Sequence, residues 1–392
     1  MSIDRRVIKY LNWPLLGLTG ALFTLGAVNL YSASAIRLED GIALSPYFHK
    51  QLVWVLVGLG GMLAFMVFDY NKFHTLAWPL FFVTLLLLAA VPFFGSKVYG
   101  ARRWLDFGLF SFQPSEVAKI TILILGARLL SRKPEKLGWR EFLFTIFIGM
   151  LPAALVVIQP DLGSSLNLLL LLAGIILYRG LKGRVLKVLA IIVPAVLPLG
   201  WFFLHDYQKQ RILTFLDPTN DPLGAGYHII QSQIAIGSGR LWGKGFLQGT
   251  QSQLRFLPEK HTDFAVAVYG EEWGFVGCIL LLSLFAMFLM SIFSTARDAR
   301  DRFGSYLAAG VFFYFFWQIL INMGMVLGLM PVVGIPLPFM SYGGSTTLVN
   351  FCLIGLVQNV SMRRHTFRHN RSLQFKGDTA YTTKKRNHAG AL

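Results

Sequence analysis

Long uncharged stretches recur along this chain of 392 residues, each of roughly 18 to 22 residues. A helix of that length crosses the hydrocarbon core of a bilayer, because each residue adds only about 1.5 Å of rise. Hydrophobic residues make up 55% of the chain and charged residues 14%, whereas a soluble domain carries about 25% charged residues. The sequence therefore predicts an all-α, polytopic membrane protein. About ten transmembrane helices are expected, at residues 13–33, 52–69, 74–94, 115–131, 141–158, 163–178, 185–204, 264–293, 305–328 and 343–361.

The basic residues fall mainly on one side of this topology, and the asymmetry predicts the orientation. Short loops rich in Lys and Arg face the cytoplasm. The net charge of +17 therefore indicates contact with anionic lipid rather than with nucleic acid. An even number of spans places both termini in the cytoplasm. The basic segments are the N-terminus, the loop with Arg132, Lys133, Lys136 and Arg140, the loop with Arg179, Lys182, Arg184 and Lys187, the loop with Arg297, Arg300 and Arg302, and the tail from Arg363 to Arg386.

The opposite side carries one long loop, residues 205–262, between the seventh and eighth predicted helices. Loops of this length are usually functional or partly structured, and they cross the membrane with little regard to their charge. The spans and this extracytoplasmic loop form a single membrane domain over residues 1–368. The remaining basic tail, residues 369–392, is polar and is expected to be disordered.

The first candidate for chemistry is Asp263, where the long loop enters the eighth predicted helix. Partial desolvation by apolar neighbours would raise its pKa toward the range of a general base. The alternative is a helix N-cap, in which Thr262 or Asp263 satisfies free N–H groups at the helix start. Glu271 and Glu272 follow. Helical phase lets at most one of them share a cavity with Asp263, so the other is expected to pair with a neighbouring helix.

Charged residues also open the fourth predicted helix. Glu116 and Lys119 are three residues apart and share a helical face, so they form either a neutralised ion pair or a charged wall of a wet cavity. Arg102 and Arg103 precede Trp104 on the same outer side. Guanidinium groups suit a pyrophosphate, and the alternative for this cluster is anchoring at the membrane interface.

Two outer segments are rich in glycine. Residues 237–245 (GSGRLWGKG) do not match the spacing of a nucleotide-binding P-loop, and we expect flexible backbone there that admits a substrate or partner. Residues 331–344, which include Ser341, are expected to line the same cavity as Asp263, with a plain re-entrant turn as the alternative. The sequence has no metal-ligand spacing of Cys and His and no G-x-S-x-G motif. Of the kinds of catalytic site considered, a site built on carboxylates is the one that remains.

Six short segments form a combined pattern along the chain. They are residues 31–34 (YSAS), 100–104 (GARRW), 112–116 (FQPSE), 159–163 (QPDLG), 256–264 (FLPEKHTDF) and 341–345 (SYGGS). Each segment is weakly informative alone, but the six in this order resemble the SEDS family (shape, elongation, division and sporulation) of bacterial cell-wall polymerases. Residues 331–338 (PVVGIPLP) and the short N-terminus resemble elongation-type members more than division-type members.

The resemblance implies a peptidoglycan glycosyltransferase that joins lipid II units by inverting transfer and releases undecaprenyl pyrophosphate. It implies a role in cell elongation and rod-shape maintenance, in the bacterial inner membrane, with the active site on the extracytoplasmic face. The implied partners are a class B penicillin-binding protein, which is a transpeptidase, and other membrane proteins of the elongation complex. A divalent cation such as Mg²⁺ is the implied cofactor.

The resemblance also implies roles for individual residues. The catalytic aspartate of the family matches Asp263, and its Glu and Lys in the fourth span match Glu116 and Lys119. Asp263 and Glu116 are the candidate metal ligands. Arg240 stands where the family commonly has Gly, and Ala265-Val266 replaces a bulkier pair, but neither change touches the acids. The expected substrate-binding residues are Glu116, Lys119, Arg103, Arg102, Asp161, His261 and Ser341.

The expected reaction needs one base and one stabilised leaving group. A sugar hydroxyl is a poor nucleophile, and the Asp263 carboxylate would take its proton during attack. A divalent ion, or Arg102, Arg103 and Lys119, would neutralise the departing pyrophosphate. The alternative functions are a lipid II flippase and a non-catalytic scaffold of the wall-synthesis complex. Charged groups at the outer ends of the spans, rather than near the midplane, argue against a flippase.

Overall fold

The computed structural model describes residues 10–364, apart from gaps at 39–40, 99–100, 107, 109–110, 133–134, 204–205, 222–223, 255 and 258. A helix occupies each position predicted for a span. The predicted tail at 369–392 lies outside the described residues. The long helices are α2 (Trp13–Ser34), α3 (Pro46–Val67), α4 (Tyr70–Phe94), α5 (Pro114–Ser131), α6 (Trp139–Ile158), α7 (Leu162–Arg179), α8 (Gly183–Gly200), α12 (Ala265–Asp298), α13 (Arg302–Val326) and α14 (Gly344–Met362).

Among the described residues, eight of these helices are long and apolar enough to cross a membrane. The chain is therefore a multi-pass membrane protein, as predicted. Helices α5 and α8 occupy the two remaining predicted positions. The apolar composition of α5 is interrupted by Glu116, Lys119 and Arg128. It tolerates these charges because α4, α6, α7, α13 and α14 all contact it and shield most of its length from lipid.

Short elements decorate the loops. The predicted long loop contains α9 (Asp206–Leu216), α10 (Ala225–Ser238) and α11 (Thr250–Gln253), with η1 (Trp201–Phe203) before it and η2 (Pro218–Asn220) within it. An antiparallel hairpin pairs β1 (Ala35–Leu38) with β2 (Gly41–Leu44), and β3 (Ser96–Val98), β4 (Ala101–Asp106) and β5 (Ser111–Phe112) form a second antiparallel sheet. The all-α class holds for the framework. The strands were missed because runs this short give no detectable alternation.

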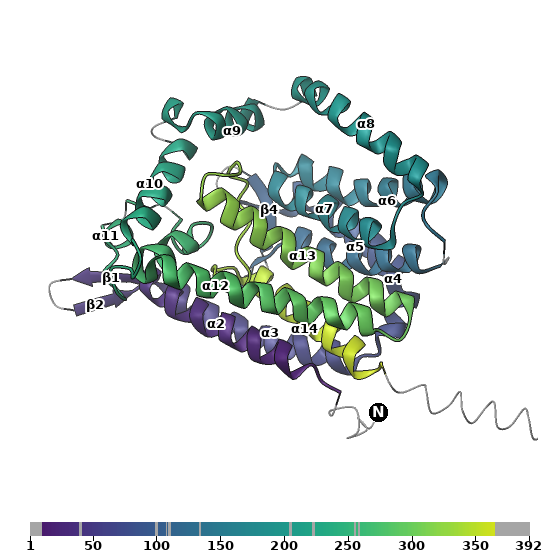
Figure 1. The fold of residues 1–392 in the computed structure, drawn as a ribbon, viewed down its shortest axis with the longest axis horizontal. Helices are drawn as coiled ribbons and strands as arrows, with labels where there is room; N and C mark the ends of the chain where they lie inside the picture. The colour runs from purple at the N-terminus through teal and green to yellow at the C-terminus, as the bar shows by residue number, and fades with distance from the viewer. Residues whose placement is uncertain are drawn as a thin grey trace, which may run out of the picture.

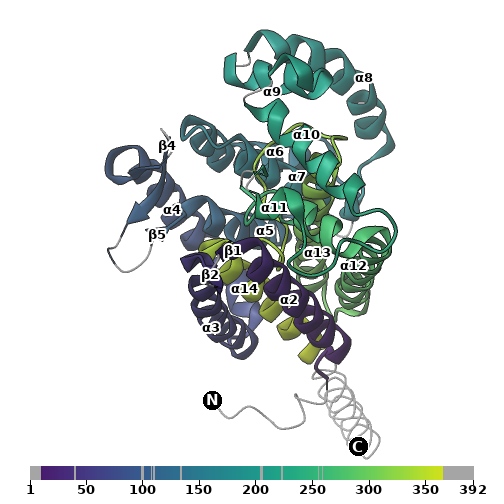
Figure 2. The same ribbon diagram turned by 90° about the vertical axis from the view of Figure 1, so that its left-hand side faces the viewer.

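The long helices run alongside one another and define two ends of the bundle (Figure 1). We call the end that carries α10, α11 and the β1–β2 hairpin the outer end, and the opposite end the inner end. Helices α8 and α9 lie to one side of the other helices in both views (Figure 2). The start of α2 meets the end of α14 at the inner end, where Asn12 and Gln358 exchange two hydrogen bonds of 2.8 and 2.9 Å. The first and last described residues therefore lie on the same side.

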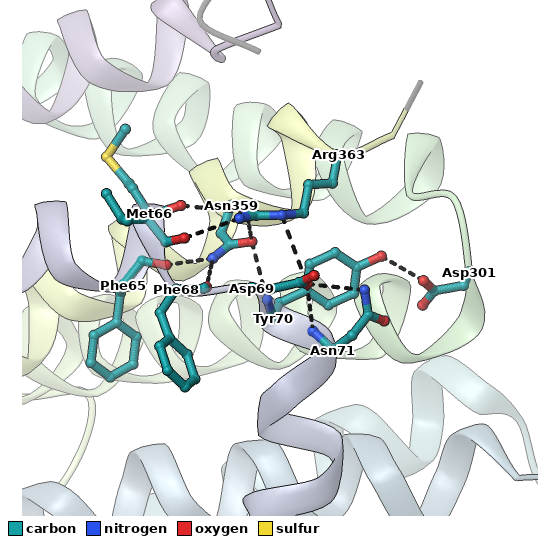
Figure 3. Close-up of polar contacts among 10 residues, drawn as sticks. Phe65, Met66, Phe68, Asp69, Tyr70, Asn71, Asp301, Asn359 and Arg363 are labelled. Carbon is teal, nitrogen blue, oxygen red and sulfur yellow. Dashed lines mark hydrogen bonds and ion pairs between the residues drawn. The ribbon is translucent and has the colours of Figure 1, made fainter. Parts of the chain in front are cut away.

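A polar network ties the inner end of α14 to the turn between α3 and α4 (Figure 3). The side-chain amide of Asn359 donates to two carbonyls at the end of α3, and its oxygen accepts from the N–H of Tyr70 at 3.3 Å. Arg363 lies 3.7 Å from Asp69. The Tyr70 hydroxyl donates at 2.5 Å to Asp301, which caps α13. The network satisfies carbonyls that a helix end leaves free, and it fixes the ends of α3 and α14 to the starts of α4 and α13.

Helix α12 is broken at Gly274, where φ is +64°. The glycine-rich segment 237–245 fills the break. The N–H groups of Phe275 and Val276 donate to carbonyls of this segment at 2.8 and 3.1 Å, and Lys244 and Gly245 donate back to carbonyls of α12 at 3.0 Å each. The expectation of flexible backbone at 237–245 was wrong. Its glycines permit backbone-to-backbone contact with the broken helix.

This contact predicts different effects for two neighbouring glycines. A Cβ on Gly239 would collide with the carbonyl of Gly270 in α12, whereas a Cβ on Gly237 meets nothing within 4 Å. Gly239→Ala is expected to destabilise the protein by about 1 to 3 kcal/mol, because backbone must move to admit the methyl group. Gly237→Ala is the control and should leave the melting temperature unchanged. Equal melting temperatures for both variants in detergent would contradict the packing described here.

The two acids of α12 have separate structural roles. Glu271 is fully buried and accepts hydrogen bonds from Lys244 at 2.7 Å, from the Thr250 hydroxyl at 3.1 Å and from the N–H of Gln251 at 3.0 Å. Glu272 accepts from the hydroxyl of Ser32 on α2. The expectation that one acid pairs with a neighbouring helix is confirmed. Glu271 holds α11 and its flanking loop on α12.

Candidate active site

Asp263 lies at the outer end, in the turn that leads into α12. The side-chain amide of Asn322, near the end of α13, donates to the backbone carbonyls of Asp263 at 2.9 Å and Ile335 at 2.8 Å. The Asp263 carboxylate faces Gly334, where an added Cβ would lie 3.5 Å from Oδ2. Because φ of Gly334 is +73°, the segment beside the carboxylate depends on glycine at this position. Asp263 is thus fixed through its backbone.

The helix-capping interpretation of this step was wrong. The N-cap position of α12 is Phe264, and it provides no side-chain cap. The Thr262 hydroxyl donates instead to the carbonyl and the carboxylate of Glu259, at 3.2 and 2.9 Å. Within the described part of the chain, no hydrogen bond engages the Asp263 carboxylate. The Asp263 carboxylate therefore takes no part in the hydrogen bonding that shapes this turn.

The surroundings of Asp263 raise its basicity. Burial raises the pKa of its carboxyl from 3.8 to about 6, the negative charge of Glu259 adds to the rise, and the positive charge of Arg211 opposes it. The Arg211 guanidinium also donates to the Val332 carbonyl at 3.1 Å, so it lies beside the same segment. With a pKa near 6 the carboxylate is mostly ionised at pH 7, yet it is a stronger base than an ordinary aspartate.

The segment 331–343 passes Asp263 and contacts the start of α7. Gly163 packs so closely against this segment that an added Cβ would collide with a backbone carbonyl. Ser341 is buried and closes a turn within the segment: its N–H donates to the Leu337 carbonyl at 3.0 Å, and its Oγ accepts from the Leu337 N–H at 2.9 Å. The expected irregular segment therefore lies beside Asp263, and Ser341 holds its shape.

The predicted residue Asp161 lies between α5 and α7. Its carboxylate caps α7 by accepting from the N–H of Ser164 at 3.1 Å, and it also accepts from the side-chain amide of Gln113 at 3.0 Å. Both contacts are structural, because they satisfy a free helical N–H and join the outer ends of two helices. A contact between Asp161 and substrate stays a prediction.

The two predicted arginines lie on strand β4. Arg103 donates to the carbonyls of Gln159 and Pro160, just before α7, while Arg102 donates to the carbonyl of Pro92 at 2.7 Å. Arg103 therefore points toward the segment that contains Asp161, and Arg102 points toward the end of α4. Each guanidinium has five N–H donors, and the contacts described here use only one or two of them. The other donors are available to bind an anion.

Glu116 and Lys119 form the ion pair predicted from their spacing. Lys119 Nζ lies 2.5 Å from Glu116 Oε1, and both residues are only 3% exposed. The ammonium group also lies 5.9 Å from the ring centroid of Tyr314 on α13, whose hydroxyl donates to Asn350 at 2.8 Å. The second carboxylate oxygen, Oε2, has no hydrogen-bond partner among the described residues. The pair is thus buried within the bundle, with one oxygen unsatisfied.

Asp263 and the ion pair lie at two depths along α13. Asn322 holds the Asp263 backbone, and Tyr314 lies next to Lys119. These two residues of α13 are eight positions apart, which corresponds to roughly 12 Å of helix rise. A single small group therefore does not touch both sites, whereas an extended substrate can reach from one to the other.

His261 joins Asp263 in the same turn, as its place in the motif predicts. Its ring is half-buried and stacks on Tyr47 of α3 with ring centroids 4.1 Å apart. Burial lowers the pKa of His261, and the Glu259 carboxylate opposes that shift. The carbonyl of His261 accepts from the N–H of Tyr342 at 2.8 Å, which ties this turn to the segment before α14.

The sequence did not reveal two residues that shape this site. Asn322 is fully buried and connects the Asp263 turn to the 331–343 segment. Its signal was a pair of amides, Gln318 and Asn322, in the apolar run of α13, because membrane helices rarely carry buried polar side chains without a function. Arg211, in α9, approaches Asp263 from the long loop, and no sequence pattern pairs residues so far apart.

The described residues contain no group of three or more His, Cys, Asp or Glu side chains that could hold a metal ion by themselves. Mg²⁺ is often bound by only one or two carboxylates, with the remaining positions taken by water and substrate phosphate. Asp263 has the free carboxylate for such a shared site, and Glu116 has one unsatisfied oxygen. The residues present therefore fit a cation that arrives with an anionic substrate.

Comparisons with known proteins agree on one family. A family model described as "Cell cycle protein", named for FtsW, RodA and SpoVE, matches residues 13–366. The peptidoglycan glycosyltransferase MrdB of Escherichia coli K12 is 42% identical over 344 residues, which is 88% of this chain and 93% of that protein. The probable peptidoglycan glycosyltransferase FtsW of Trichlorobacter lovleyi is 37% identical over 347 residues, 87% of this chain and 90% of that protein.

Solved structures give the same result for the fold. A structure described as "Structural coordination of polymerization and crosslinking by a peptidoglycan synthase complex" matches with a TM-score of 0.75 and 31% identity, over 91% of this chain and 99% of that chain. Sequence and architecture thus agree over almost the full length of both proteins. The chain belongs to the SEDS family, the family of FtsW, RodA and SpoVE.

Proposed function

We propose that this protein is a peptidoglycan glycosyltransferase that polymerises glycan strands from lipid II. The observation that carries the proposal is the Asp263 carboxylate, which is half-buried, has a raised pKa and is engaged by no hydrogen bond within the described residues. A group in this state suits general base catalysis. The glycosyltransferases named among the relatives support the same activity.

The first step of the proposed reaction is attack by an acceptor hydroxyl. The 4-hydroxyl of the terminal N-acetylglucosamine attacks the anomeric carbon of the donor, and Asp263 takes the hydroxyl proton as the new bond forms. The anomeric bond to the pyrophosphate breaks on the opposite face, so the configuration inverts. One base is enough for this displacement, and no covalent enzyme intermediate forms.

The second requirement is stabilisation of the departing undecaprenyl pyrophosphate. Lys119 supplies a buried positive charge deeper in the bundle, and Arg102 and Arg103 supply guanidinium groups at the outer end. The difference in depth fits a substrate whose sugars lie outward and whose prenyl chain lies in the bilayer. Asp161, His261 and Ser341 complete the proposed substrate contacts, with Glu116 orienting Lys119.

A divalent cation such as Mg²⁺ is the proposed cofactor. Asp263 is its proposed protein ligand at the outer end, and Glu116, which lies deeper in the bundle, would hold a cation only at a separate position. Bound together with the substrate, the cation would supply positive charge to the pyrophosphate leaving group. If this is correct, removing divalent ions with a chelator should lower polymerisation and added Mg²⁺ should restore it. Full activity in a chelator would contradict the cation proposal and leave the role of Asp263 intact.

The proposed setting is the bacterial inner membrane, with both termini in the cytoplasm and the outer end of the bundle outside it. The basic loops support this orientation. A class B penicillin-binding protein, together with other membrane proteins of the elongation complex, is the proposed partner. The similar structure described as a synthase complex that coordinates polymerisation and crosslinking supports a transpeptidase partner. The elongation-type character of residues 331–338 favours a RodA-like role in rod shape.

One assay separates this proposal from a flippase and from a scaffold. Lipid II is added to the outer leaflet of vesicles that contain the purified protein, with and without its transpeptidase. A polymerase forms glycan strands under these conditions, because no transport is needed. A flippase or a scaffold forms none.

The pKa of Asp263 predicts an acid limb in the pH profile. The rate of polymerisation should fall about tenfold per pH unit below pH 6, because the protonated carboxyl cannot accept a proton. Glu259→Gln removes a negative charge that raises the pKa of Asp263. The acid limb of this variant's pH profile should therefore move to lower pH. Asp298→Asn, at the inner end, removes the same charge far from the site and is the control.

The profile is recorded with and without added Mg²⁺, because a cation beside Asp263 would lower its pKa. An acid limb that does not respond to Glu259→Gln would contradict the assignment of this limb to Asp263.

A further inference from the structure

Three aromatic rings from distant parts of the chain meet beside Asp263. Tyr47 lies in the first turn of α3, His261 in the turn before α12, and Tyr342 in the segment before α14. The rings of Tyr47 and His261 stack with centroids 4.1 Å apart and planes inclined by 17°. The Tyr342 ring lies 5.0 Å from that of Tyr47, inclined by 63°, and 6.3 Å from that of His261. We call Tyr47, His261 and Tyr342 the aromatic cluster.

Backbone and amide contacts hold the aromatic cluster in place. The N–H of Tyr342 donates to the His261 carbonyl at 2.8 Å. Gln51, one turn after Tyr47 on α3, is buried; its oxygen accepts from the N–H of Gly343 at 3.3 Å and its amide donates to the Thr347 hydroxyl at 2.9 Å. The segment before α14 is therefore hydrogen-bonded to both α3 and the His261 turn, and the ring positions are set by the fold rather than by surface mobility.

The aromatic cluster is accessible and close to the proposed base. Tyr47 is 38% exposed, and His261 and Tyr342 are half-buried. His261 is two residues before Asp263, so their Cα atoms lie no more than about 7 Å apart. A ligand resting on these rings therefore has its reactive edge within reach of the Asp263 carboxylate.

The chemistry of the rings indicates a sugar. A pyranose presents C–H groups on one face and hydroxyl groups at its edge, and aromatic side chains offer a flat apolar surface with polar rims that match both. Tyrosine at a membrane interface can also act as a plain anchor. An anchor has no need to be tied to the turn that carries Asp263, whereas a sugar platform requires that connection.

We propose that the aromatic cluster binds the acceptor N-acetylglucosamine of lipid II and directs its 4-hydroxyl toward Asp263. The inference rests on the proposed polymerase function and adds the acceptor subsite, with Tyr47 and Tyr342 as residues that the sequence motifs did not assign. The acceptor is favoured over the donor because the platform adjoins the base, which handles the acceptor proton.

The kinetic test uses two substrates that can be varied separately. A lipid II analogue with a blocked 4-hydroxyl serves only as donor and is held constant, while a disaccharide acceptor with a free 4-hydroxyl and no pyrophosphate on its anomeric carbon is varied. Tyr47→Ala and Tyr342→Ala should each raise KM for the acceptor about tenfold and leave kcat within about twofold, since binding rather than chemistry is changed. Tyr47→Phe keeps the ring and should recover most of the lost affinity.

Phe48→Ala is the matched control. Phe48 neighbours Tyr47 on α3, but its ring contacts Tyr31 at 5.4 Å and belongs to a separate group. This variant should keep the acceptor KM. Unchanged acceptor KM in both Tyr47→Ala and Tyr342→Ala would overturn the proposal, and so would a rise confined to the donor KM.

A binding measurement makes the proposal independent of turnover. Saturation-transfer NMR with the soluble disaccharide N-acetylglucosaminyl-N-acetylmuramic acid is run on Asp263→Asn protein, with and without Tyr47→Ala. The proposal predicts saturation transfer to the C–H protons of the glucosamine ring. This transfer should be lost when Tyr47→Ala is also present. Transfer that survives this change would contradict it. If the wild type forms no polymer, the proposed function fails, and the binding result still decides whether the platform exists.

Discussion

Lys119→Met is expected to destabilise the protein and to abolish most of its polymerase activity. Lys119 is the cation of an ion pair in which both side chains are 4% exposed. Removing one partner of a buried pair leaves an uncompensated charge and typically costs about 3 to 5 kcal/mol. Lys119 is also proposed to face the pyrophosphate, and the loss of that positive charge should lower the rate by at least about tenfold in addition.

The double variant Glu116→Gln/Lys119→Met separates these two effects. It leaves no charge buried, so most of the stability should return, as measured by the melting temperature in detergent. Activity should stay low, because the proposed pyrophosphate contact is still missing. A double variant that regains wild-type activity would show that Lys119 acts only on the fold.

Lys244→Met supplies a matched control for this experiment. Lys244 also pairs with a buried acid, Glu271, at 2.7 Å. That acid keeps hydrogen bonds from Thr250, Gln251 and Ser252, so the loss should be only about 1 kcal/mol. Polymerisation by folded Lys244→Met protein should match the wild type.

Asp263→Asn is expected to lower polymerisation by about a hundredfold to ten-thousandfold, the usual range for loss of a general base. The fold should survive, since Asn322 holds the backbone of Asp263 and not its carboxylate. The amide is similar in size and cannot accept the proton from the acceptor. Substrate affinity should change less than the rate.

The same variant should be at least as stable as the wild type at pH 7. The pKa of Asp263 is about 6 in the folded protein, above its ordinary value of 3.8. The folded state therefore binds the proton more tightly than the unfolded state, and stability falls as pH rises from about 4 to 6. Asn carries no charge and avoids this loss. A melting temperature well below that of the wild type at pH 7 would contradict the burial of this charge.

Hydrophobic patterning was enough to locate the framework. The helices and the Glu116–Lys119 pair follow from local spacing, since both depend on residues only a few positions apart. The start of α3 was placed too late, at residue 52, because the span was predicted from its uncharged run and Lys50 lies just before that run. The structure begins this helix at Pro46, a residue that suits the first helical position.

Features that depend on distant segments could not be read from the sequence. The break at Gly274 lies in an apolar run that resembles one continuous helix, and the segment that stabilises it lies about thirty residues earlier. The aromatic cluster joins residues 47, 261 and 342, which no local pattern relates. Sequence motifs identified Asp263, but the partners that position it come from α13 and from the long loop.

The most direct measurement is the length and amount of glycan that purified wild-type and Asp263→Asn proteins form from lipid II, each with the proposed transpeptidase partner and Mg²⁺. Melting temperature and partner binding are measured first, to show that both proteins are folded and bind the partner. Long strands from the wild type and almost none from the variant are predicted. Comparable strands from both proteins would contradict the assignment of Asp263 as the base.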